Sequence, residues 1–162
     1  MKKKIAIFPG SFDPFTNGHL SIVKKSLNLF DEIIIAIGYN EKKNGYFSIE
    51  KREMWIKKIF FFEKKIKVLS YKGLTTDFCK KLNIDFIVRG IRNTTDFNYE
   101  NSIAQINKIL LPRIETIFFT SNSELSVISS SVVREVLKMG GDISKFIPKE
   151  IELQIKNDFK KS

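Results

Sequence analysis

Residues 5–19 of the chain read IAIFPGSFDPFTNGH, and this stretch decides the fold. The apolar run at residues 5–8 is typical of a buried strand, and from Leu20 onward apolar residues recur at helical spacing. Residues 9–19 are therefore predicted to form a tight loop and the beginning of a helix. Such a junction directs backbone N–H groups and the positive end of the helix dipole at one point, which suits a phosphate. It also delivers His19, the only histidine of the chain, to that point.

The same alternation of strand and helix continues along the chain. Further strands are predicted at residues 33–37, 66–70, 86–88 and 114–119, and helices at residues 20–30, after Ser48 as an N-cap, and at 77–82, 94–111, 130–139 and 148–159. Strands rich in β-branched and aromatic residues between helices are typical of a parallel sheet covered on both faces. We therefore predict a doubly wound α/β fold with five parallel strands. No linker-like stretch interrupts it, so residues 1–162 are expected to form a single domain.

Four segments that follow predicted strands hold most of the unusual polar residues of the chain. They are residues 9–19, 38–46, 88–92 and 120–131. In doubly wound sheets, ligands bind outside the carboxyl ends of the strands, where the winding reverses. We therefore expect these segments to meet in one site.

The composition limits the class of protein. Cys79 is the only cysteine, so a disulfide framework is excluded and a zinc site of cysteines and histidines is not expected. A reducing, cytoplasmic setting is therefore the expectation. The lysines at residues 2–4 precede an apolar run that is too short for a signal peptide, and no run is long enough to cross a bilayer.

The formal net charge of +10 raises the question of nucleic-acid binding, because a basic surface attracts a polyanion. Most of the excess charge is lysine in short clusters such as Lys24-Lys25 and Lys80-Lys81, without arginines interleaved with exposed aromatic residues. This distribution favours a solvated, lysine-rich surface over a nucleic-acid footprint. We expect no nucleic-acid and no membrane partner.

Neither familiar phosphate-binding loop is present. The chain has no GxxxxGK[ST] sequence and no GxGxxG after its first strand, which argues against a P-loop NTPase and a standard dinucleotide dehydrogenase. Instead, residues 16–19 form a T-x-G-H element, in which Gly18 leaves room for a phosphate or purine and His19 can donate a hydrogen bond to a phosphate oxygen. A lone histidine at a helix start is more often a capping residue, and the surrounding residues are what favour the phosphate role.

Two later segments also suit phosphates. Arg89 and Arg92 flank Gly90 at a strand end and suit a phosphate dianion, although pairing of these arginines with Asp85 or Asp96 is the alternative. Residues 128–134 read ISSSVVR, and three serines at a helix start offer hydroxyl and backbone donors to a polyphosphate. Ordinary N-capping by one of these serines is the alternative there.

Taken together, these motifs closely resemble the bacterial phosphopantetheine adenylyltransferases of the nucleotidylyltransferase superfamily. The resemblance covers essentially the whole chain: PGSFDPFTNGH at residues 9–19, Lys43 followed by YFS at residues 46–48, RGIR at residues 89–92, DFNYE at residues 96–100, and ISSSVVR. The T-x-G-H element alone would indicate only the superfamily. The resemblance implies a Rossmann-like nucleotidylyltransferase fold.

The resemblance implies transfer of AMP from ATP to 4′-phosphopantetheine by direct in-line attack, without a covalent intermediate. The products would be dephospho-coenzyme A and pyrophosphate, in the penultimate step of coenzyme A synthesis. A phosphate monoester is already an oxyanion near neutral pH, so this reaction needs alignment and charge stabilisation more than a general base. By the same resemblance, the catalytic residues are His19, Lys43 and Arg92.

The resemblance also implies two sets of binding residues. The ATP-binding set is Ser11, Phe12, His19, Gly90, Ile91, Arg92, Glu100, Leu125, Ser126, Val127, Ile128, Ser129, Ser130 and Ser131. The set for the pantetheine substrate is Ser11, Lys43, Thr75 and Arg89. No protein-held metal is implied, and Mg²⁺ would accompany ATP through its phosphates and water. Feedback binding of coenzyme A and a homohexamer are further implications.

Two other functions stay open at this point. A related nucleotidylyltransferase would keep the fold and the ATP site but use another acceptor, such as nicotinate mononucleotide. A basic nucleotide- or nucleic-acid-binding module would lack catalysis altogether. The presence of His19, Lys43 and Arg92 disfavours that module, because a sensor need not keep groups that act only in a transition state.

Overall fold

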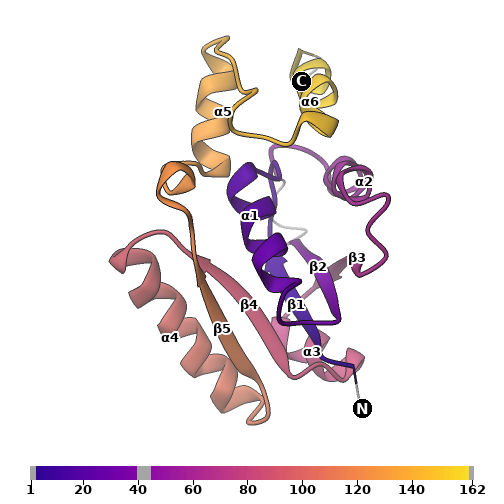
Figure 1. The fold of residues 1–162 in the computed structure, drawn as a ribbon, viewed down its shortest axis with the longest axis vertical. Helices are drawn as coiled ribbons and strands as arrows, with labels where there is room; N and C mark the ends of the chain where they lie inside the picture. Colours follow the sequence, from indigo (N-terminus) through magenta and orange to yellow (C-terminus); the bar gives the residue numbers. More distant parts are fainter. Residues whose placement is uncertain (1–2, 40–44, 161–162) are drawn as a thin grey trace.

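The computed structural model describes residues 3–39 and 45–160, and its centre is a sheet of five parallel strands (Figure 1). The strands are β1 (Ile5–Gly10), β2 (Glu32–Tyr39), β3 (Ile66–Lys72), β4 (Phe86–Ile91) and β5 (Glu115–Thr120), in the order β3-β2-β1-β4-β5. The predicted doubly wound α/β fold is confirmed.

Helices cover both faces of this sheet. The helices α1 (Asn17–Ser26) and α2 (Ile49–Ile59) pack on one face, where Ile22 and Trp55 join the larger core cluster. The helices α3 (Thr75–Leu82) and α4 (Thr94–Leu110) belong to the other face, where Cys79 and Leu111 join a second cluster. Because right-handed crossovers must change face when the winding changes direction, this arrangement places the reversal between β1 and β4.

The strands β1 and β4 separate at this reversal. Their pairing covers only Ala6↔Phe86 and Ile7↔Ile87, whereas β1 pairs with β2 as far as Gly10↔Ile37 and β4 pairs with β5 as far as Ile91↔Thr120. The carboxyl ends of β1 and β4 therefore diverge. We call this divergence the split of the sheet, and it opens a space at the point where a ligand is expected.

The last part of the chain lies against the first two helices. After β5, a short 3₁₀ turn (Ser123–Leu125) leads into α5 (Ser130–Lys138), and α6 (Lys149–Lys160) packs against α2 (Figure 1). The helix α5 ends as predicted, because the N–H groups of Gly140 and Gly141 donate to the carbonyls of Leu137 and Val136, and Gly140 has a φ of 70°. The N–H of Asn17 donates to the carbonyl of Phe146 at 2.8 Å, which ties the start of α1 to this segment.

Several element boundaries differ from the sequence-based expectation, most of them by one or two residues, and the largest differences are at β4 and α1. The strand β4 reaches Ile91 instead of ending at residue 88, because residues 89–91 pair with β5 at Phe118, Phe119 and Thr120. The helix α1 ends at Ser26 instead of continuing to residue 30, since the N–H groups of Asn28 and Leu29 turn back to the carbonyls three residues earlier. The side chain of Phe30 is nevertheless buried in the core cluster that the apolar spacing indicated.

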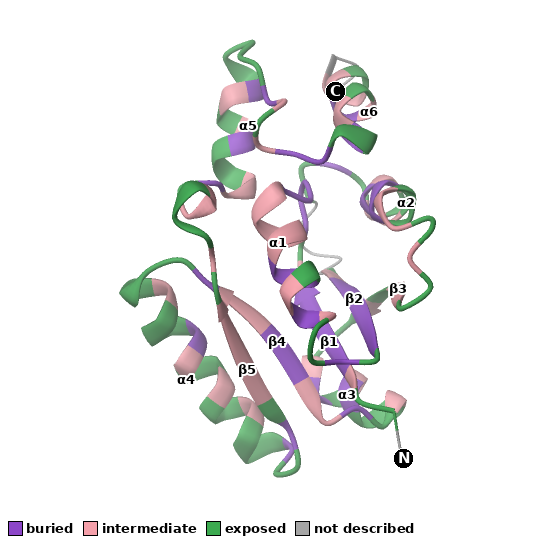
Figure 2. Ribbon diagram, viewed as in Figure 1, coloured by how far each residue is buried: buried purple, intermediate pink, exposed green. Residues whose placement is uncertain are grey.

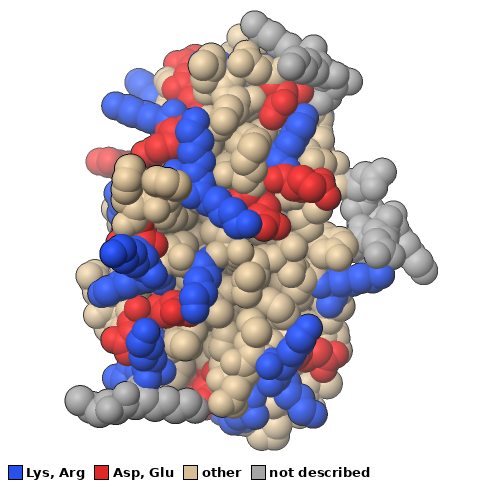
Figure 3. All heavy atoms as spheres, turned by 90° about the vertical axis from the view of Figure 1, so that its right-hand side faces the viewer, with Lys and Arg blue, Asp and Glu red and all other residues tan. Residues whose placement is uncertain are grey.

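Burial and charge follow the layered fold. The strands β1 and β2 are buried almost throughout, whereas much of α4 is exposed (Figure 2). On the face seen in Figure 3, lysine and arginine side chains are interspersed with acidic and uncharged ones instead of forming one continuous patch. Within residues 3–39 and 45–160, no helix combines the length and the apolar character needed to cross a bilayer.

Candidate active site

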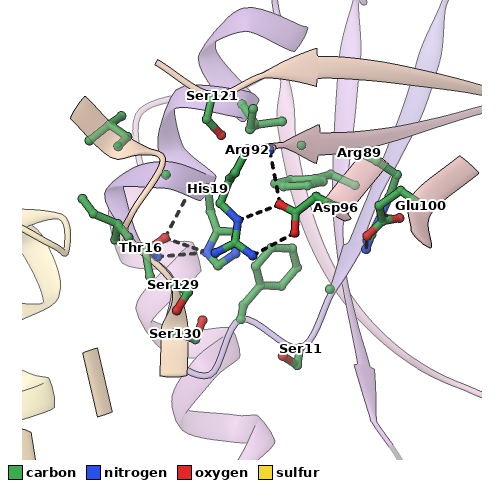
Figure 4. A pocket seen from close by; sticks show the side chains of 18 of the residues that line it. Ser11, Thr16, His19, Arg89, Arg92, Asp96, Glu100, Ser121, Ser129 and Ser130 are labelled. Atoms are coloured by element: carbon green, nitrogen blue, oxygen red, sulfur yellow. Dashed lines mark hydrogen bonds and ion pairs between the residues drawn. The ribbon is translucent and has the colours of Figure 1, made fainter. Parts of the chain in front are cut away.

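A pocket occupies the split between β1 and β4, which we call the first pocket. Its walls come from the loop after β1, the start of α1, the end of β4, the start of α4 and the segment before α5. The sequence predicted that four segments would meet in one site, and three of them meet here: residues 9–19, 88–92 and 120–131. Of the fourth, residues 38–46, no described residue lines this pocket. The residues at the wall include His19, Arg92 and Ser129 (Figure 4).

His19 sits in a capping box at the start of α1. The His19 N–H donates to Thr16 Oγ1 at 3.3 Å, and the Thr16 N–H donates in return to His19 Nδ1 at 3.0 Å (Figure 4). Since Nδ1 accepts a backbone hydrogen bond, the proton of a neutral imidazole lies on Nε2. His19 is therefore both the capping residue of the alternative interpretation and a group with a free N–H donor.

The surroundings of His19 keep its ring neutral. The ring packs against Phe12, Phe15 and Phe8, with centroid separations of 5.0, 5.3 and 6.2 Å. Burial, and then the positive charges of Arg89 and Arg92, lower the pKa of His19 from 6.5 to about 3. At neutral pH His19 can thus donate a hydrogen bond from Nε2 to a phosphate oxygen. Because its ring is neutral, it does not act as a general acid that protonates the leaving group.

The loop that begins with Ser11 has a strained turn at Phe12. Phe12 has a φ of 47°, in the left-handed region, which costs a residue with a side chain about 1–2 kcal/mol. Gly10 makes room for the resulting ring position, since a methyl group on Gly10 would lie 2.9 Å from Cζ of Phe12. The ring of Phe12 is buried, so the turn is fixed from within the core.

Arg92 lies at the outer wall of the first pocket. Its Nε donates to Oδ2 of Asp96 at 2.8 Å, and its Nη2 donates to Oδ1 of Asp96 at 3.2 Å. Asp96 follows four residues later, in the first turn of α4, and this hydrogen bond raises the pKa of Arg92 and lowers that of Asp96. The pairing with Asp96 that the sequence offered as an alternative is therefore present, and it holds the guanidinium group at the pocket.

Arg89 crosses the split from β4. Its Nε donates to Oε2 of Glu100 at 2.7 Å, its Nη2 pairs with Oε1 of Glu100, and its Nη1 donates to the carbonyl of Pro9 on β1. Glu100 is buried, so its carboxylate depends on these two donors. A side chain thus joins β1 and β4 where their backbone pairing has ended.

The start of α5 closes the first pocket on the opposite side. Ser129 is the N-cap, and its Oγ accepts from the Val132 N–H at 3.2 Å, while Ser130 Oγ donates to the carbonyl of Pro14 at 2.8 Å. Gly18 lies close to this segment, because a methyl group there would be 3.7 Å from the carbonyl oxygen of Ile128. Two of the three serines therefore have structural hydrogen bonds in addition to lining the pocket.

A second pocket lies behind the same wall, on the face of the sheet that α3 and α4 cover, and its lining includes residues of both helices and of β3, β4 and β5. It shares five residues with the first pocket: Pro9, Gly10, Ser11, Arg89 and Glu100. Its remaining lining is largely apolar, with Tyr71, Ile87, Tyr99, Ile103 and Ala104, and its polar residues include Thr75, Asn107 and Thr116. The hydroxyl of Thr75 is hydrogen-bonded to the Tyr71 hydroxyl at 2.8 Å, whereas Thr116 Oγ1 is buried and has no partner among the described residues.

The structure brings together most of the residues that the resemblance implied. The first pocket is lined by the predicted residues Ser11, Phe12, His19, Gly90, Arg92, Glu100, Leu125, Ile128, Ser129 and Ser130, and the second by Ser11, Thr75 and Arg89. Neither pocket is lined by Ile91, Ser126, Val127 or Ser131, and Lys43 lies outside the described residues. The roles of all these residues stay predictions.

The comparisons with known proteins agree with this geometry. Residues 7–136 match the cytidylyltransferase-like family model. A phosphopantetheine adenylyltransferase of Flavobacterium psychrophilum is 52% identical over 92% of this chain and 98% of its own length, and one of Bacteroides thetaiotaomicron is 53% identical over 91% and 97%. One of Leptospira biflexa is 49% identical over 90% and 91%.

The chain belongs to the phosphopantetheine adenylyltransferase family. The family resemblance inferred from the sequence is therefore confirmed. As a member of this family, the chain also carries the cytidylyltransferase-like fold, which agrees with the observed five-stranded parallel sheet.

Some residues of this phosphopantetheine adenylyltransferase-family site were not found from the sequence. Asp96 and Ser121 line the first pocket, and Tyr99, Asn107 and Thr116 line the second. Tyr99, Ile103 and Asn107 recur every four residues on α4, so the helical spacing carried a signal for one face of that helix. Only the fold shows that this face looks into a pocket.

Proposed function

We propose that this chain transfers the adenylyl group of ATP to the phosphate of 4′-phosphopantetheine, giving dephospho-coenzyme A and pyrophosphate. The observation that supports this most is the shared wall of Ser11, Arg89 and Glu100 between the two pockets. ATP would occupy the first pocket and the pantetheine substrate the second. Their reacting phosphates would then meet beside Arg89, at the split of the sheet.

The side chains in the first pocket fit an in-line displacement. An oxygen of the acceptor phosphate would attack the α-phosphorus of ATP, and the bond to the pyrophosphate oxygen would break, so no proton needs to be removed from the nucleophile. Neutral His19 would donate from Nε2 to an α-phosphate oxygen, where charge develops. Arg92 would offer its guanidinium group to the polyphosphate, and Lys43 would contribute a further positive charge by the family pattern.

The second pocket suits the pantetheine arm. This arm is flexible and carries amide groups between short apolar segments, and the pocket combines an apolar wall with the polar groups of Asn107 and Thr116. A nucleotide acceptor such as nicotinate mononucleotide would instead place a rigid ring and ribose against this apolar wall.

Mg²⁺ is proposed as the ion that accompanies ATP. The carboxylates at the first pocket, Asp96 and Glu100, are each paired with an arginine, and residues 3–39 and 45–160 contain no cluster of three metal-ligating side chains. Magnesium is commonly held by substrate phosphates, water and one or two carboxylates, so these residues fit an ion that arrives with the nucleotide. When bound, it would neutralise charge on the leaving pyrophosphate.

We also propose a homohexamer, feedback binding of coenzyme A in the two pockets, and a cytoplasmic location. The row Ile106, Ile109 and Leu110 on α4 supports self-association, because each of these apolar side chains is more than half exposed in the single chain. Light scattering on the purified protein would give its mass in solution. Competition between coenzyme A and 4′-phosphopantetheine would test the feedback site.

The proposed reaction is tested by pyrophosphate release from ATP and Mg²⁺ with 4′-phosphopantetheine, beside nicotinate mononucleotide and glycerol 3-phosphate as competing acceptors. We expect release with 4′-phosphopantetheine alone. Release with another acceptor would keep the ATP site and overturn the assignment of the second pocket. Silence with all three acceptors would favour a nucleotide-binding module without catalysis.

A further inference from the structure

Two arginines that neither pocket includes hold the loop between β1 and α1. Arg52 on α2 donates from Nη1 to the carbonyl of Ser11 at 2.7 Å, and Arg134 on α5 donates from Nη1 to the carbonyl of Asp13 at 2.6 Å. Arg52 is buried, and Arg134 is partly buried against the loop. Two guanidinium groups from different helices thus donate hydrogen bonds to the carbonyls on either side of Phe12.

The side chain of Asp13 also holds this loop in place. Its Oδ2 accepts from the Tyr46 N–H at 2.6 Å and its Oδ1 from the Phe47 N–H at 2.9 Å. The carboxylate of Asp13 is buried, and its charge acts on the neighbouring Arg52 guanidinium. The loop is therefore fixed by three charged side chains, which are Arg52 from α2, Arg134 from α5 and its own Asp13.

The direction of the Phe12 N–H follows from the hydrogen bond between Arg52 and the Ser11 carbonyl. The Ser11–Phe12 peptide is trans, so its N–H points away from its carbonyl and hence away from Arg52. Phe12 lines the first pocket, and within the described part of the chain its N–H makes no hydrogen bond. A left-handed residue such as Phe12 persists only where its surroundings hold it. The carbonyls thus face the arginines, and a backbone donor is left beside His19.

We propose that Arg52 and Arg134 are positioning residues, which clamp the Ser11 and Asp13 carbonyls so that the Phe12 N–H and the Nε2 of His19 are held together toward the α-phosphate. This proposal rests on the proposed function. It differs from a direct phosphate contact by Arg134, which the ISSSVVR segment alone would suggest, because the Nη1 of Arg134 is already committed to Asp13. The two arginines act through the loop and not on the substrate.

The test compares Arg134→Met with Arg134→Lys, because Arg134 is partly exposed and its loss is less disruptive than that of buried Arg52. Arg134→Met removes the donor, and we expect kcat to fall about 30-fold with KM for ATP within threefold, since misplacement of reacting groups by an ångström lowers rates by about 10²-fold. Arg134→Lys keeps one donor and the charge, and should recover most of this loss. Arg52→Lys should behave as Arg134→Lys does.

Arg113→Met is the matched control. Arg113 pairs with Asp85 at the surface and lines neither pocket, so this variant loses the same charge away from the loop. Its kcat should equal that of the unmodified chain. If Arg134→Met raises the KM for ATP and leaves kcat unchanged, Arg134 contacts the phosphate directly. If Arg113→Met lowers kcat as much as Arg134→Met does, the loss is a general effect of charge. Either result would overturn the clamp.

Hydrogen exchange separates this proposal from the proposed function. In Arg134→Met the amides of Thr16, Tyr46 and Phe47, which donate to the side chains of His19 and Asp13, should exchange at least tenfold faster than in the unmodified chain, while those of β1 and β2 keep their rates. Unchanged exchange at these three amides overturns the clamp, whether or not the protein turns over. An unmodified chain that binds ATP and releases no pyrophosphate would overturn the proposed function, and the exchange rates would still decide the clamp.

Discussion

The two pockets share a wall, but they are built on different principles. In the first pocket the charged groups and the neutral His19 ring already have partners: Arg92 pairs with Asp96, Arg89 pairs with Glu100, and His19 accepts from the backbone of Thr16. In the second pocket the lining is mostly apolar, and Thr116 Oγ1 has no partner within the described residues. The comparison indicates that the polar side chains of the first pocket are held in place by other protein groups, whereas the second pocket offers mainly apolar surface.

The largest expected effect comes from the first pocket. Replacement of His19 by alanine removes a donor aimed at developing charge, and we expect kcat to fall by 10²- to 10³-fold, a loss of about 3 kcal/mol of transition-state stabilisation. ATP binding, measured by calorimetry, should weaken only modestly. A His19→Ala protein with unchanged turnover would remove the catalytic distinction between the two pockets.

The shared wall should show the next largest effect, on stability. Arg89→Met leaves the buried carboxylate of Glu100 without its two donors, and we expect a loss of about 3 kcal/mol in the free energy of unfolding. Arg92→Met breaks an exposed pair within one helical turn and should cost about 0.5 kcal/mol. Urea unfolding of both variants measures the difference.

The double variant Arg89→Met with Glu100→Leu is the control for this difference, because it removes the charge that was left unpaired. It should recover most of the lost stability while activity stays low. If Arg89→Met and Arg92→Met lose equal stability, the two arginines do not differ in the way that their burial indicates.

The second pocket should respond in substrate affinity. Asn107→Leu removes a polar group from its lining, and we expect the KM for 4′-phosphopantetheine to rise about fivefold to tenfold, as for a lost hydrogen bond worth about 1 kcal/mol. The KM for ATP should not change. Asn101→Leu on the same helix is the matched control, since Asn101 does not line this pocket. Equal changes in both KM values would contradict the separation of the two sites.

The smallest expected effect near neutral pH is the pH dependence of stability. The pKa of His19 is about 3 in the folded chain and 6.5 without the fold, so between these values the unfolded chain binds the extra proton. Stability should therefore fall as the pH falls through 6.5 toward 3, and the slope that His19 contributes should become negligible about one pH unit above 6.5. His19→Gln keeps a capping-box residue without a titrating ring, and its unfolding free energy should change less over this pH range. Identical pH profiles would show that the fold does not lower the pKa of His19.

Much of the first pocket could be predicted from the sequence, because its residues lie in short contiguous motifs. The T-x-G-H element and the run ISSSVVR each combine a helix start with polar side chains, so local rules placed them near one another at the sheet edge. The pairing of Arg92 with Asp96 was also within reach, since the two are four residues apart at a helix start.

The second pocket was less predictable, because its walls come from elements that are distant in the sequence. Tyr71 and Thr116 belong to β3 and β5, which lie at opposite edges of the sheet, and only the packing of α4 brings a lining together. The roles of Arg52 and Arg134 were hidden for a similar reason. Each donates to a backbone carbonyl, and a carbonyl leaves no trace in the identity of the residue that carries it.

The split of the sheet has a mechanical consequence. Two backbone pairs join β1 to β4, so the sheet consists of two halves that are joined along a short stretch. The hydrogen bond from Arg89 to the carbonyl of Pro9 links the two strands beyond that stretch. A nucleotide and an acceptor bound there would connect the two halves, since each pocket is lined by residues of both β1 and β4. We expect bound substrates to raise the melting temperature of the protein. When the products leave, the junction between β1 and β4 should become more flexible, so that its rigidity follows the occupancy of the two pockets.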